Sequence, residues 1–209
     1  MNFNKLRVFF VKNIKWIILL YCVIAFIFIM RDVLSKEVIE YDKNIYNFIA
    51  SFIHDNNTKV IKVITFLGHG IPLILITLLM LFLCKNKRLG ILVGTNLITV
   101  VILNNILKFI VRRARPTIFP IVDESGYSFP SGHSMVSMAF YGFIIYLIYK
   151  NVKNVKLKWL VMSLLTLLII LIGVSRIYLG VHYVSDVLAG FLIAIAYLIL
   201  FISVTKIIY

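Results

Sequence analysis

The chain changes character at Gly126-Tyr127-Ser128-Phe129-Pro130-Ser131-Gly132-His133-Ser134, a polar and turn-rich stretch between two long apolar runs. Its proline and glycine disfavour regular structure, and either Ser131 or Ser134 can cap the helix that residues 135–149 are expected to form. The stretch therefore predicts a helix N-terminus that carries a histidine. Free backbone N–H groups and the positive end of the helix dipole attract anions at such a position. An ordinary capped loop has the same pattern, so the anion site depends on residues elsewhere in the chain.

Composition indicates a membrane protein. Of the 209 residues, 62% are hydrophobic and only 14% are charged, and the mean hydropathy is +1.02. A soluble domain carries about 25% charged residues. We therefore expect an integral membrane protein with an all-α fold and a single domain over residues 1–209.

Neither the charge nor the cysteines suggest another class of protein. The formal charge of +14 does not indicate nucleic-acid binding, because the cations fall in short loops between apolar segments, where membrane topology accounts for them. Cys22 and Cys84 both lie within apolar segments, so neither suggests a disulfide or a metal site.

Six apolar segments are long enough to cross a bilayer. We expect these spans at about residues 14–30, 60–84, 89–107, 134–149, 157–174 and 186–205. The second span is interrupted by Gly68-His69-Gly70 and by Pro72, so its bounds are the least defined. The first span follows a basic segment, as in a secretory signal. No small-residue cleavage site comes after it, and we interpret it as a transmembrane helix.

Between the first two spans, apolar side chains recur at helical spacing among charged ones. They are Val38, Tyr41, Ile45, Phe48 and Phe52. This pattern is typical of a short amphipathic helix that lies at the membrane surface.

The distribution of charge predicts the orientation, because short cytoplasmic loops collect Lys and Arg. One side receives 12 of the 22 cations and no acid, from residues 1–15, 85–88 and 150–158 and from Lys206. We therefore expect a multi-pass protein of the plasma membrane with both termini in the cytoplasm. The stretch from Gly126 to Ser134 then faces outward.

Two further polar clusters are expected at the same outer level, and one lies at the end of the third span. It contains Lys108, Arg112, Arg113 and Arg115, of which residues 108, 112 and 115 would share one face of a helix. For Arg112 and Arg113, a belt of snorkelling side chains at the lipid headgroups is an equal alternative, so their roles stay open.

The other cluster runs from Ser175-Arg176 through His182 to Asp186. His182 and Asp186 are four residues apart, so on a helical turn the carboxylate can reach the imidazole. Such a carboxylate fixes the tautomer and leaves the other ring nitrogen free to act as a nucleophile or a base. For His54 and His69 we prefer the simpler interpretation of a core residue.

The cations of these clusters favour an anionic ligand. Lys108, Arg115 and Arg176 supply positive charge without a matching set of buried acids, and phosphate fits the fork of an arginine. Asp123 and Glu124 could bind a cation, but two neighbouring acids in a loop are more simply interpreted as solvated. The sequence contains no metal-ligand cluster, so we expect neither a metal nor another cofactor.

Three spaced motifs carry a resemblance to a known family. They are Lys108-x6-Arg115-Pro116, Pro130-Ser131-Gly132-His133 and Ser175-Arg176-x5-His182-x3-Asp186. In residue and spacing they resemble the three-part signature of the type 2 phosphatidic acid phosphatase superfamily. The short six-span layout is similar to that of its bacterial membrane lipid phosphatases. The resemblance covers roughly residues 108–190.

The resemblance implies a reaction through a phosphohistidine. His182 would attack phosphorus, Asp186 would orient its ring, and His133 would protonate the leaving oxygen and later activate water. The phosphate oxygens would be held by Lys108, Arg115, Ser131, the Gly132 backbone N–H and Arg176.

We therefore expect a metal-independent phosphatase that cleaves a phosphomonoester or diphosphate from a lipid at the outer leaflet. Phosphatidylglycerophosphate, undecaprenyl pyrophosphate, phosphatidic acid and diacylglycerol pyrophosphate all fit the motifs. A lipid-linked phosphotransferase and a non-catalytic binder or transporter of anionic lipids are the alternatives. A binder does not need the paired His182 and Asp186, which favours an enzyme. We expect the lipid bilayer as a partner, but neither nucleic acid nor an obligate protein partner.

Overall fold

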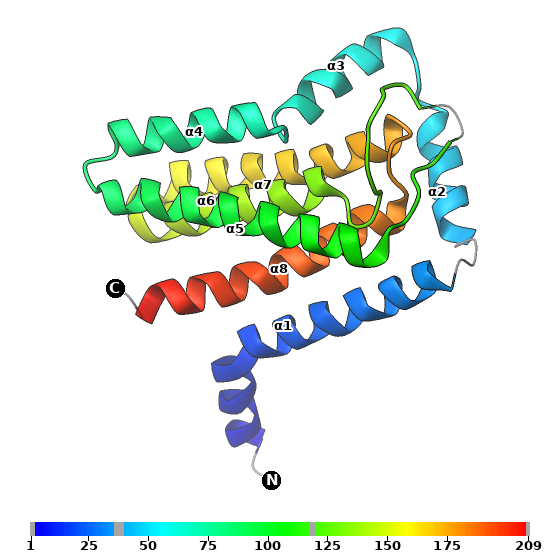
Figure 1. Ribbon diagram of the computed structural model, residues 1–209. Coiled ribbons are helices and arrows are strands. Elements are labelled where there is room, and N and C mark those ends of the chain that lie inside the picture. Colours follow the sequence, from blue (N-terminus) through cyan, green and yellow to red (C-terminus); the bar gives the residue numbers. More distant parts are fainter. Residues whose placement is uncertain (1–2, 36–39, 118–119, 208–209) are drawn as a thin grey trace.

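The computed structural model describes residues 3–35, 40–117 and 120–207, and within these ranges it contains helices and no strand (Figure 1). The helices are α1 (Phe3–Leu34), α2 (Glu40–Ala50), α3 (Asp55–Phe66), α4 (Gly70–Leu83), α5 (Lys87–Val111), α6 (Gly132–Asn151), α7 (Val155–Tyr178) and α8 (Val184–Ile207). The expected all-α fold is confirmed. Figure 1 shows α2 across one end of the long helices, beside the α5–α6 connection and the α7–α8 turn. We call this end the α2 end.

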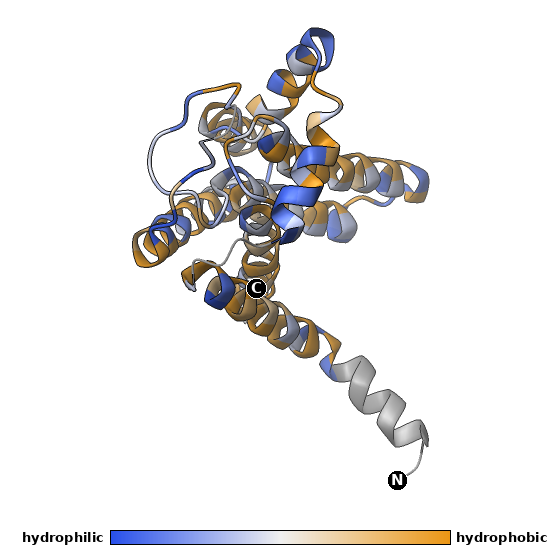
Figure 2. Cartoon of the chain, turned by 90° about the vertical axis from the view of Figure 1, so that its right-hand side faces the viewer, coloured by the Kyte–Doolittle hydropathy of each residue, from blue (hydrophilic) through white to orange (hydrophobic). Residues whose placement is uncertain are grey.

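Five segments in the described part of the chain are long and apolar enough to cross a membrane. They are Asn13–Leu34, Lys87–Val111, Gly132–Asn151, Val155–Tyr178 and Val184–Thr205. Figure 2 shows that apolar residues dominate these helices, and many of their large apolar side chains are exposed. Exposed apolar surface of this extent is suited to contact with lipid rather than water. The chain is therefore a multi-pass membrane protein.

The second expected span, residues 60–84, is a pair of helices rather than one. Helices α3 and α4 are bent by 45° at the break between them, so there are six spans only if the pair crosses the membrane as one unit. At the break, Nδ1 of His69 accepts a hydrogen bond from the N–H of Ile71 at 3.4 Å and so begins α4. Pro72 lies in the first turn of α4, where its missing N–H costs no helical hydrogen bond. The breaker residues thus divide the span.

Helix α2 corresponds to the amphipathic helix expected from Val38 to Phe52. Val38 lies outside the described residues, and Phe52 follows the end of the helix. The expected apolar stripe is exposed at Tyr41, Ile45 and Phe48. Exposure of this stripe fits a helix that lays its apolar face into lipid at the membrane surface. Another face of α2 packs against α7 and α8.

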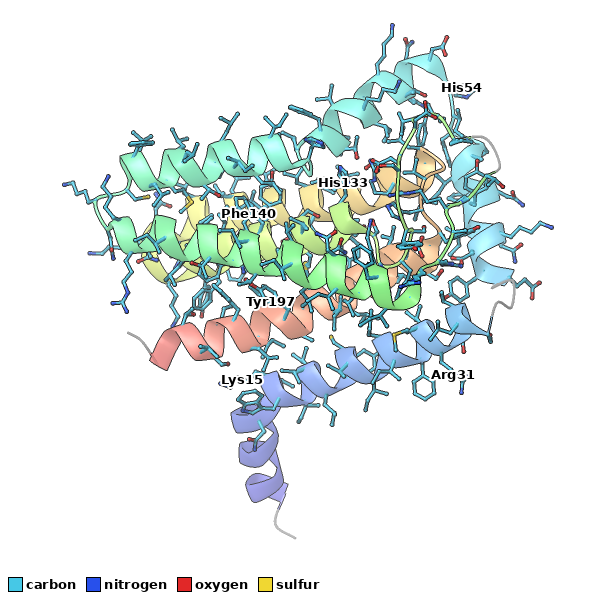
Figure 3. All side chains as sticks on the ribbon, viewed as in Figure 1. Lys15, Arg31, His54, His133, Phe140 and Tyr197 are labelled. Atoms are coloured by element: carbon cyan, nitrogen blue, oxygen red, sulfur yellow. The ribbon has the colours of Figure 1, made fainter. Side chains whose placement is uncertain are left out.

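The core of the bundle is centred on α6, which contacts α5, α7 and α8. Side chains from four helices are fully buried together in its largest apolar cluster, among them Leu73, Val93, Phe140 and Ile172. Phe140, labelled in Figure 3, belongs to this cluster. Packing of this density fixes the positions of the helix ends that carry the polar clusters.

One close approach holds the polar stretch before α6 against α8. A Cβ atom at Gly190 would lie 3.0 Å from the carbonyl oxygen of Ser131, so a larger residue would force the two segments apart. The N–H of Ser131 donates to the carbonyl oxygen of Asp186 at 3.0 Å. The stretch is therefore fixed directly to the beginning of α8.

Candidate active site

The polar residues singled out in the sequence gather at the α2 end. They come from the last turns of α5 and α7, the α5–α6 connection, the start of α6 and the α7–α8 turn. In Figure 3, His133 lies at the end of α6 that faces this cluster. The α5–α6 connection folds over the cluster (Figure 1). It is held there by hydrogen bonds from the N–H of Ile121 to the carbonyl of Leu179 at 3.0 Å and from the N–H of Ser128 to the carbonyl of Arg113 at 2.8 Å.

Arg112 ends α5 and redirects the chain. It adopts the left-handed conformation (φ 52°, ψ 35°), which is unfavourable for residues other than glycine, and its N–H donates to the carbonyl of Lys108 at 2.9 Å. The helix face predicted to join residues 108, 112 and 115 is therefore wrong. Helix α5 ends at Val111, and Arg115 reaches the cluster from the connection. Arg112 itself is exposed, which fits the headgroup-belt alternative. Its Nε donates to the carbonyl of Phe109 at 3.0 Å.

His182 lies at the centre of the cluster and is 2% exposed. Its Nδ1 lies 3.4 Å from Oδ2 of Asp186 and 3.3 Å from the hydroxyl of Ser128. Its Nε2 lies 3.1 Å from Nη1 of Arg115, which can only donate. The proton therefore resides on Nδ1 and the lone pair on Nε2. Burial lowers the pKa of His182 to about 4, against the opposing effect of Asp186 and with a smaller contribution from Arg115, so the ring is neutral at pH 7.

Asp186 is fully buried and accepts hydrogen bonds from several donors. They are the hydroxyl of Ser128, the N–H of Tyr183 at 2.9 Å and Nη1 of Arg113 at 2.7 Å. No function is predicted from the sequence for Ser128, although it lies in the polar stretch, and the role of Arg113 is left open there. The headgroup-belt alternative is wrong for Arg113, because its side chain is only 15% exposed and pairs with carboxylates.

Two arginines lie next to His182. Arg115 donates from Nε to the carbonyl of Gly126 and from Nη1 to the carbonyl of Val181, both at 3.1 Å. Arg176 is 2% exposed, and its Nη1 donates to Oγ1 of Thr65 at 2.8 Å, whereas its Nε has no hydrogen-bond partner among the described residues. A buried donor without a partner costs about 1–3 kcal/mol. This guanidinium is therefore suited to a further anionic ligand.

Glu124 is exposed, as expected for a solvated acid, but it also pairs with two arginines. Its carboxylate lies 3.4 Å from Nη2 of Arg115 and forms a second ion pair with Arg176, and its side chain is 29% exposed. Burial raises the pKa of Glu124, but the two arginines outweigh burial and hold the pKa below its usual value. An anionic oxygen pair therefore already lies between these arginines. Asp123, the neighbouring acid, is exposed as expected.

Lys108 and the first residues of α6 form another side of the cluster. A Cβ atom at Gly132 would lie 3.2 Å from Oδ1 of Asn104 and 4.0 Å from Nζ of Lys108, so the ammonium group lies beside the helix N-terminus. Ser131 is the helix cap, because its hydroxyl accepts a hydrogen bond from the N–H of Ser134 at 3.5 Å. Free N–H groups and an ammonium group thus converge on one space, which attracts anions.

His133 faces the break between α3 and α4. Its ring centroid lies 6.2 Å from that of His69, and a Cβ atom at Gly68 would lie 3.2 Å from Cδ2 of His133.

The interpretation of His54 and His69 as core residues is wrong, because both are exposed. Within the described ranges, no three His, Cys, Asp or Glu side chains gather in a way that could hold a metal ion.

A cavity of about 730 Å³ lies beside His182. Leu34 and Val111 contribute apolar wall, and Lys43 and Arg112 contribute positive charge. A largely apolar cavity with a few convergent charged groups is typical of a site for a small ligand or headgroup. His182 is among the residues that line it, whereas the predicted phosphate-binding residues Lys108, Arg115, Ser131, Gly132 and Arg176 are not.

Known proteins share the sequence and the fold of this chain. Residues 89–208 match the family model described as the PAP2 superfamily. Phosphatidylglycerophosphatase B of Bacillus subtilis (strain 168) is 38% identical over 137 residues, which cover 64% of this chain and 68% of that protein. The crystal structure of a transmembrane PAP2-type phosphatidylglycerolphosphate phosphatase from Bacillus subtilis is similar with a TM-score of 0.81 and 32% identity, over 91% of this chain and 97% of that one. Aquifex aeolicus LpxE shares the fold, with a TM-score of 0.63 and 22% identity over 77% of this chain and 93% of that one.

Proposed function

The chain belongs to the PAP2 superfamily and is a membrane phosphatase of that family, and we propose that it removes the phosphate of phosphatidylglycerophosphate at the outer face of the plasma membrane. His182 carries the proposal: a buried, neutral ring has Asp186 at one nitrogen and Arg115 at the other. The choice of lipid is supported by the Bacillus subtilis relatives that are named for it.

The first step transfers the phosphoryl group to His182. The lone pair on Nε2 attacks phosphorus while the bond from phosphorus to the lipid oxygen breaks. His133 donates a proton to that oxygen, so the lipid leaves with a neutral hydroxyl group at that position. Asp186 stabilises the positive charge that the imidazole ring gains. Because Arg115 lies on Nε2 in the free enzyme, we expect the incoming phosphate to draw this guanidinium onto its own oxygens.

The second step hydrolyses the phosphohistidine with the same groups in reverse. His133 is now neutral and takes a proton from a water molecule, whose oxygen attacks phosphorus. The bond between phosphorus and Nε2 breaks, and its electron pair returns to His182. Inorganic phosphate leaves, and His133 is protonated again for the next lipid.

The cations are proposed to hold the oxygens of the phosphate as charge spreads over them, with the cap residue Ser131 and the Gly132 N–H beside them. Support comes from Arg115 and Arg176, which already bind the carboxylate of Glu124. A phosphate group offers the same kind of oxygens with more charge. It also offers an acceptor for the unpartnered Nε of Arg176. Catalysis then depends on position and electrostatics.

The site is proposed to face outward, with both termini in the cytoplasm. The uneven distribution of Lys and Arg supports this orientation. The α4–α5 and α6–α7 turns, which carry many of these cations, lie at the end opposite the α2 end (Figure 1). A Tyr127→Cys variant, with both native cysteines changed to alanine, should react with an impermeant maleimide on intact cells. Reaction only after lysis would invert the orientation.

Rates on four lipids test the proposed substrate. The purified protein in detergent is given phosphatidylglycerophosphate, phosphatidic acid, undecaprenyl pyrophosphate or diacylglycerol pyrophosphate at equal mole fraction, with and without a chelator. We expect the fastest release of inorganic phosphate from phosphatidylglycerophosphate and no effect of the chelator, because the proposed catalytic groups are all side chains or backbone N–H groups.

The other possible results would contradict the proposed substrate, the metal-independent mechanism or the hydrolase activity. A faster reaction with a diphosphate would replace the proposed substrate, and loss of release with the chelator would contradict the metal-independent mechanism. Transfer of phosphate to an added alcohol, with none released, would indicate a phosphotransferase. Binding of all four lipids without any turnover would indicate a binder.

A further inference from the structure

Arg113 lies between two buried carboxylates. Its Nη1 donates to Oδ1 of Asp186 at 2.7 Å, and its Nη2 donates to Oδ2 of Asp42 at 3.1 Å. Asp186 is fully buried, and Asp42 is 6% exposed. The guanidinium also stacks over the ring of Tyr183, with Cζ 3.9 Å from the ring centroid. One side chain therefore connects helix α2 with the carboxylate beside His182.

Asp42 also binds the N-terminus of α8 directly. The N–H of Ser185 donates to Oδ1 of Asp42 at 2.7 Å, and the hydroxyl of Ser185 donates to Oδ2 at 2.6 Å. The first N–H groups of a helix have no partner within the helix, so an anion at this position satisfies a donor and the helix dipole together. Nη1 of Arg113 closes the arrangement by donating to the hydroxyl of Ser185 at 2.7 Å.

We propose that Arg113 and Asp42 are positioning residues of the phosphoryl-transfer reaction, with Arg113 aiming Asp186 at Nδ1 of His182 and Asp42 sharing the charge of Arg113. This inference rests on the proposed function, because it takes His182 as the nucleophile. It gives α2, a helix at the membrane surface, a part in the chemistry. Neither residue touches the phosphate in this scheme.

The charges of the group explain why two carboxylates are needed. Asp42 and Asp186 carry two negative charges against the one positive charge of Arg113, which leaves one negative charge beside the neutral ring. When His182 attacks phosphorus, the ring becomes positive and the group becomes neutral. If Asp42 were absent, Arg113 would neutralise Asp186 by itself and leave less negative charge for the ring. The charges of Asp42, Asp186, Arg113 and the His182 ring therefore sum to zero once the ring is phosphorylated.

A purely structural explanation is that the same contacts only anchor α2 to α8. The two explanations differ in what they predict for kcat at unchanged thermal stability, together with the titration of His182. The charged or titratable groups that act on this ring come from α8, α7, the α5–α6 connection and α6, and they are Asp186, Arg176, Arg115, Glu124 and His133. Removing either charge also changes the field at the ring through space in both cases. Positioning residues lower kcat at unchanged thermal stability, whereas a structural anchor lowers kcat only in step with thermal stability.

The test compares Asp42→Asn and Arg113→Gln in the full-length protein in detergent. Glu40→Gln is the matched control, because it removes an exposed acid from the same helix without touching Arg113. We measure kcat and KM for phosphatidylglycerophosphate and the thermal stability, together with the pKa and tautomer of His182 by NMR of 15N-labelled histidine. A His182→Asn sample assigns the signal.

We expect kcat to fall by about 10-fold in Asp42→Asn and by about 100-fold in Arg113→Gln, with KM nearly unchanged, the range found for residues that orient metal-ligating histidines. The pKa of His182 should fall in Asp42→Asn, because negative charge is lost, and rise in Arg113→Gln, because positive charge is lost. Asp42→Glu should restore most of kcat. Glu40→Gln should match the unsubstituted protein.

Activity lost in both variants only in step with thermal stability would reduce the group to an anchor and overturn the inference. That result leaves the proposed function intact. The proposed function would instead be contradicted if the two variants shifted the pKa of His182 in opposite directions but the unsubstituted protein released phosphate from none of the lipids. The two failures are therefore distinguishable.

Discussion

Replacing His182 with alanine should abolish phosphate release from every lipid substrate. The expected loss in kcat is about 10⁴-fold or more, because removing the nucleophile of a cooperating set leaves only binding and electrostatic stabilisation. The unsubstituted protein, mixed briefly with lipid phosphate labelled with 32P and quenched in alkali, should carry label on His182. The variant should carry none. Mass spectrometry of the labelled peptide identifies the modified residue.

A second substitution separates the loss of the nucleophile from a loss of folding. His182→Ala leaves the buried carboxylate of Asp186 without one of its partners, at a cost of about 1–3 kcal/mol. His182→Asn retains an N–H donor near the position of Nδ1, and we expect it to be folded and equally inactive. Substantial activity in the asparagine variant, or label on another residue, would exclude His182 as the nucleophile.

Replacing His133 with alanine should have the next largest effect, and the size should depend on the leaving group. Loss of a general acid costs about 10² to 10⁴-fold when the leaving oxygen needs a proton. We expect a loss in this range for a lipid alkoxide. For p-nitrophenyl phosphate, whose leaving group is stable as an anion, the first step should be nearly normal. The second step still lacks its base, so the phosphoenzyme should accumulate.

Rapid-quench kinetics measure this difference. The variant should show a burst of p-nitrophenol that is equal to the amount of enzyme, followed by slow turnover. His69→Ala is a suitable control, because His69 has its ring centroid 6.2 Å from that of His133 but has no assigned step. Equal losses on both substrates, without a burst, would mean that His133 does not transfer the proton to the leaving group.

The membrane-spanning part of the fold could be predicted because crossing a bilayer requires about 20 consecutive apolar residues, and a short window of sequence contains that signal. The division of residues 60–84 is indicated by Gly68-His69-Gly70 and Pro72, whereas the end of α5 could not be predicted. At α5, the sequence shows charged residues that could continue a helix. Residue 112 is an arginine rather than the glycine or asparagine that usually adopts the left-handed conformation at a helix end, so the sequence does not signal the end of α5.

In the candidate site, a contact between residues close in the sequence could be predicted, whereas contacts between distant residues could not. His182 and Asp186 are four residues apart, so local spacing predicts that they meet. Asp42 and Glu124 have no such signal, because their partners are distant in the chain: Arg113 lies 71 residues from Asp42, and Arg176 lies 52 residues from Glu124. An acid in a polar segment is ordinarily interpreted as solvated. Only the fold shows that these two acids neutralise buried arginines.

The contact between Asp42 and Ser185 joins residues 143 positions apart, and this has a consequence for biosynthesis. As the ribosome threads the chain into the bilayer, α2 emerges early but finds its partner only when α8 has been made. His182 and Asp186 also arrive at this late stage. We therefore expect a nascent chain to be inert towards the lipids around it until α8 is inserted. The phosphatase would then become active in a single event, at the completion of its assembly.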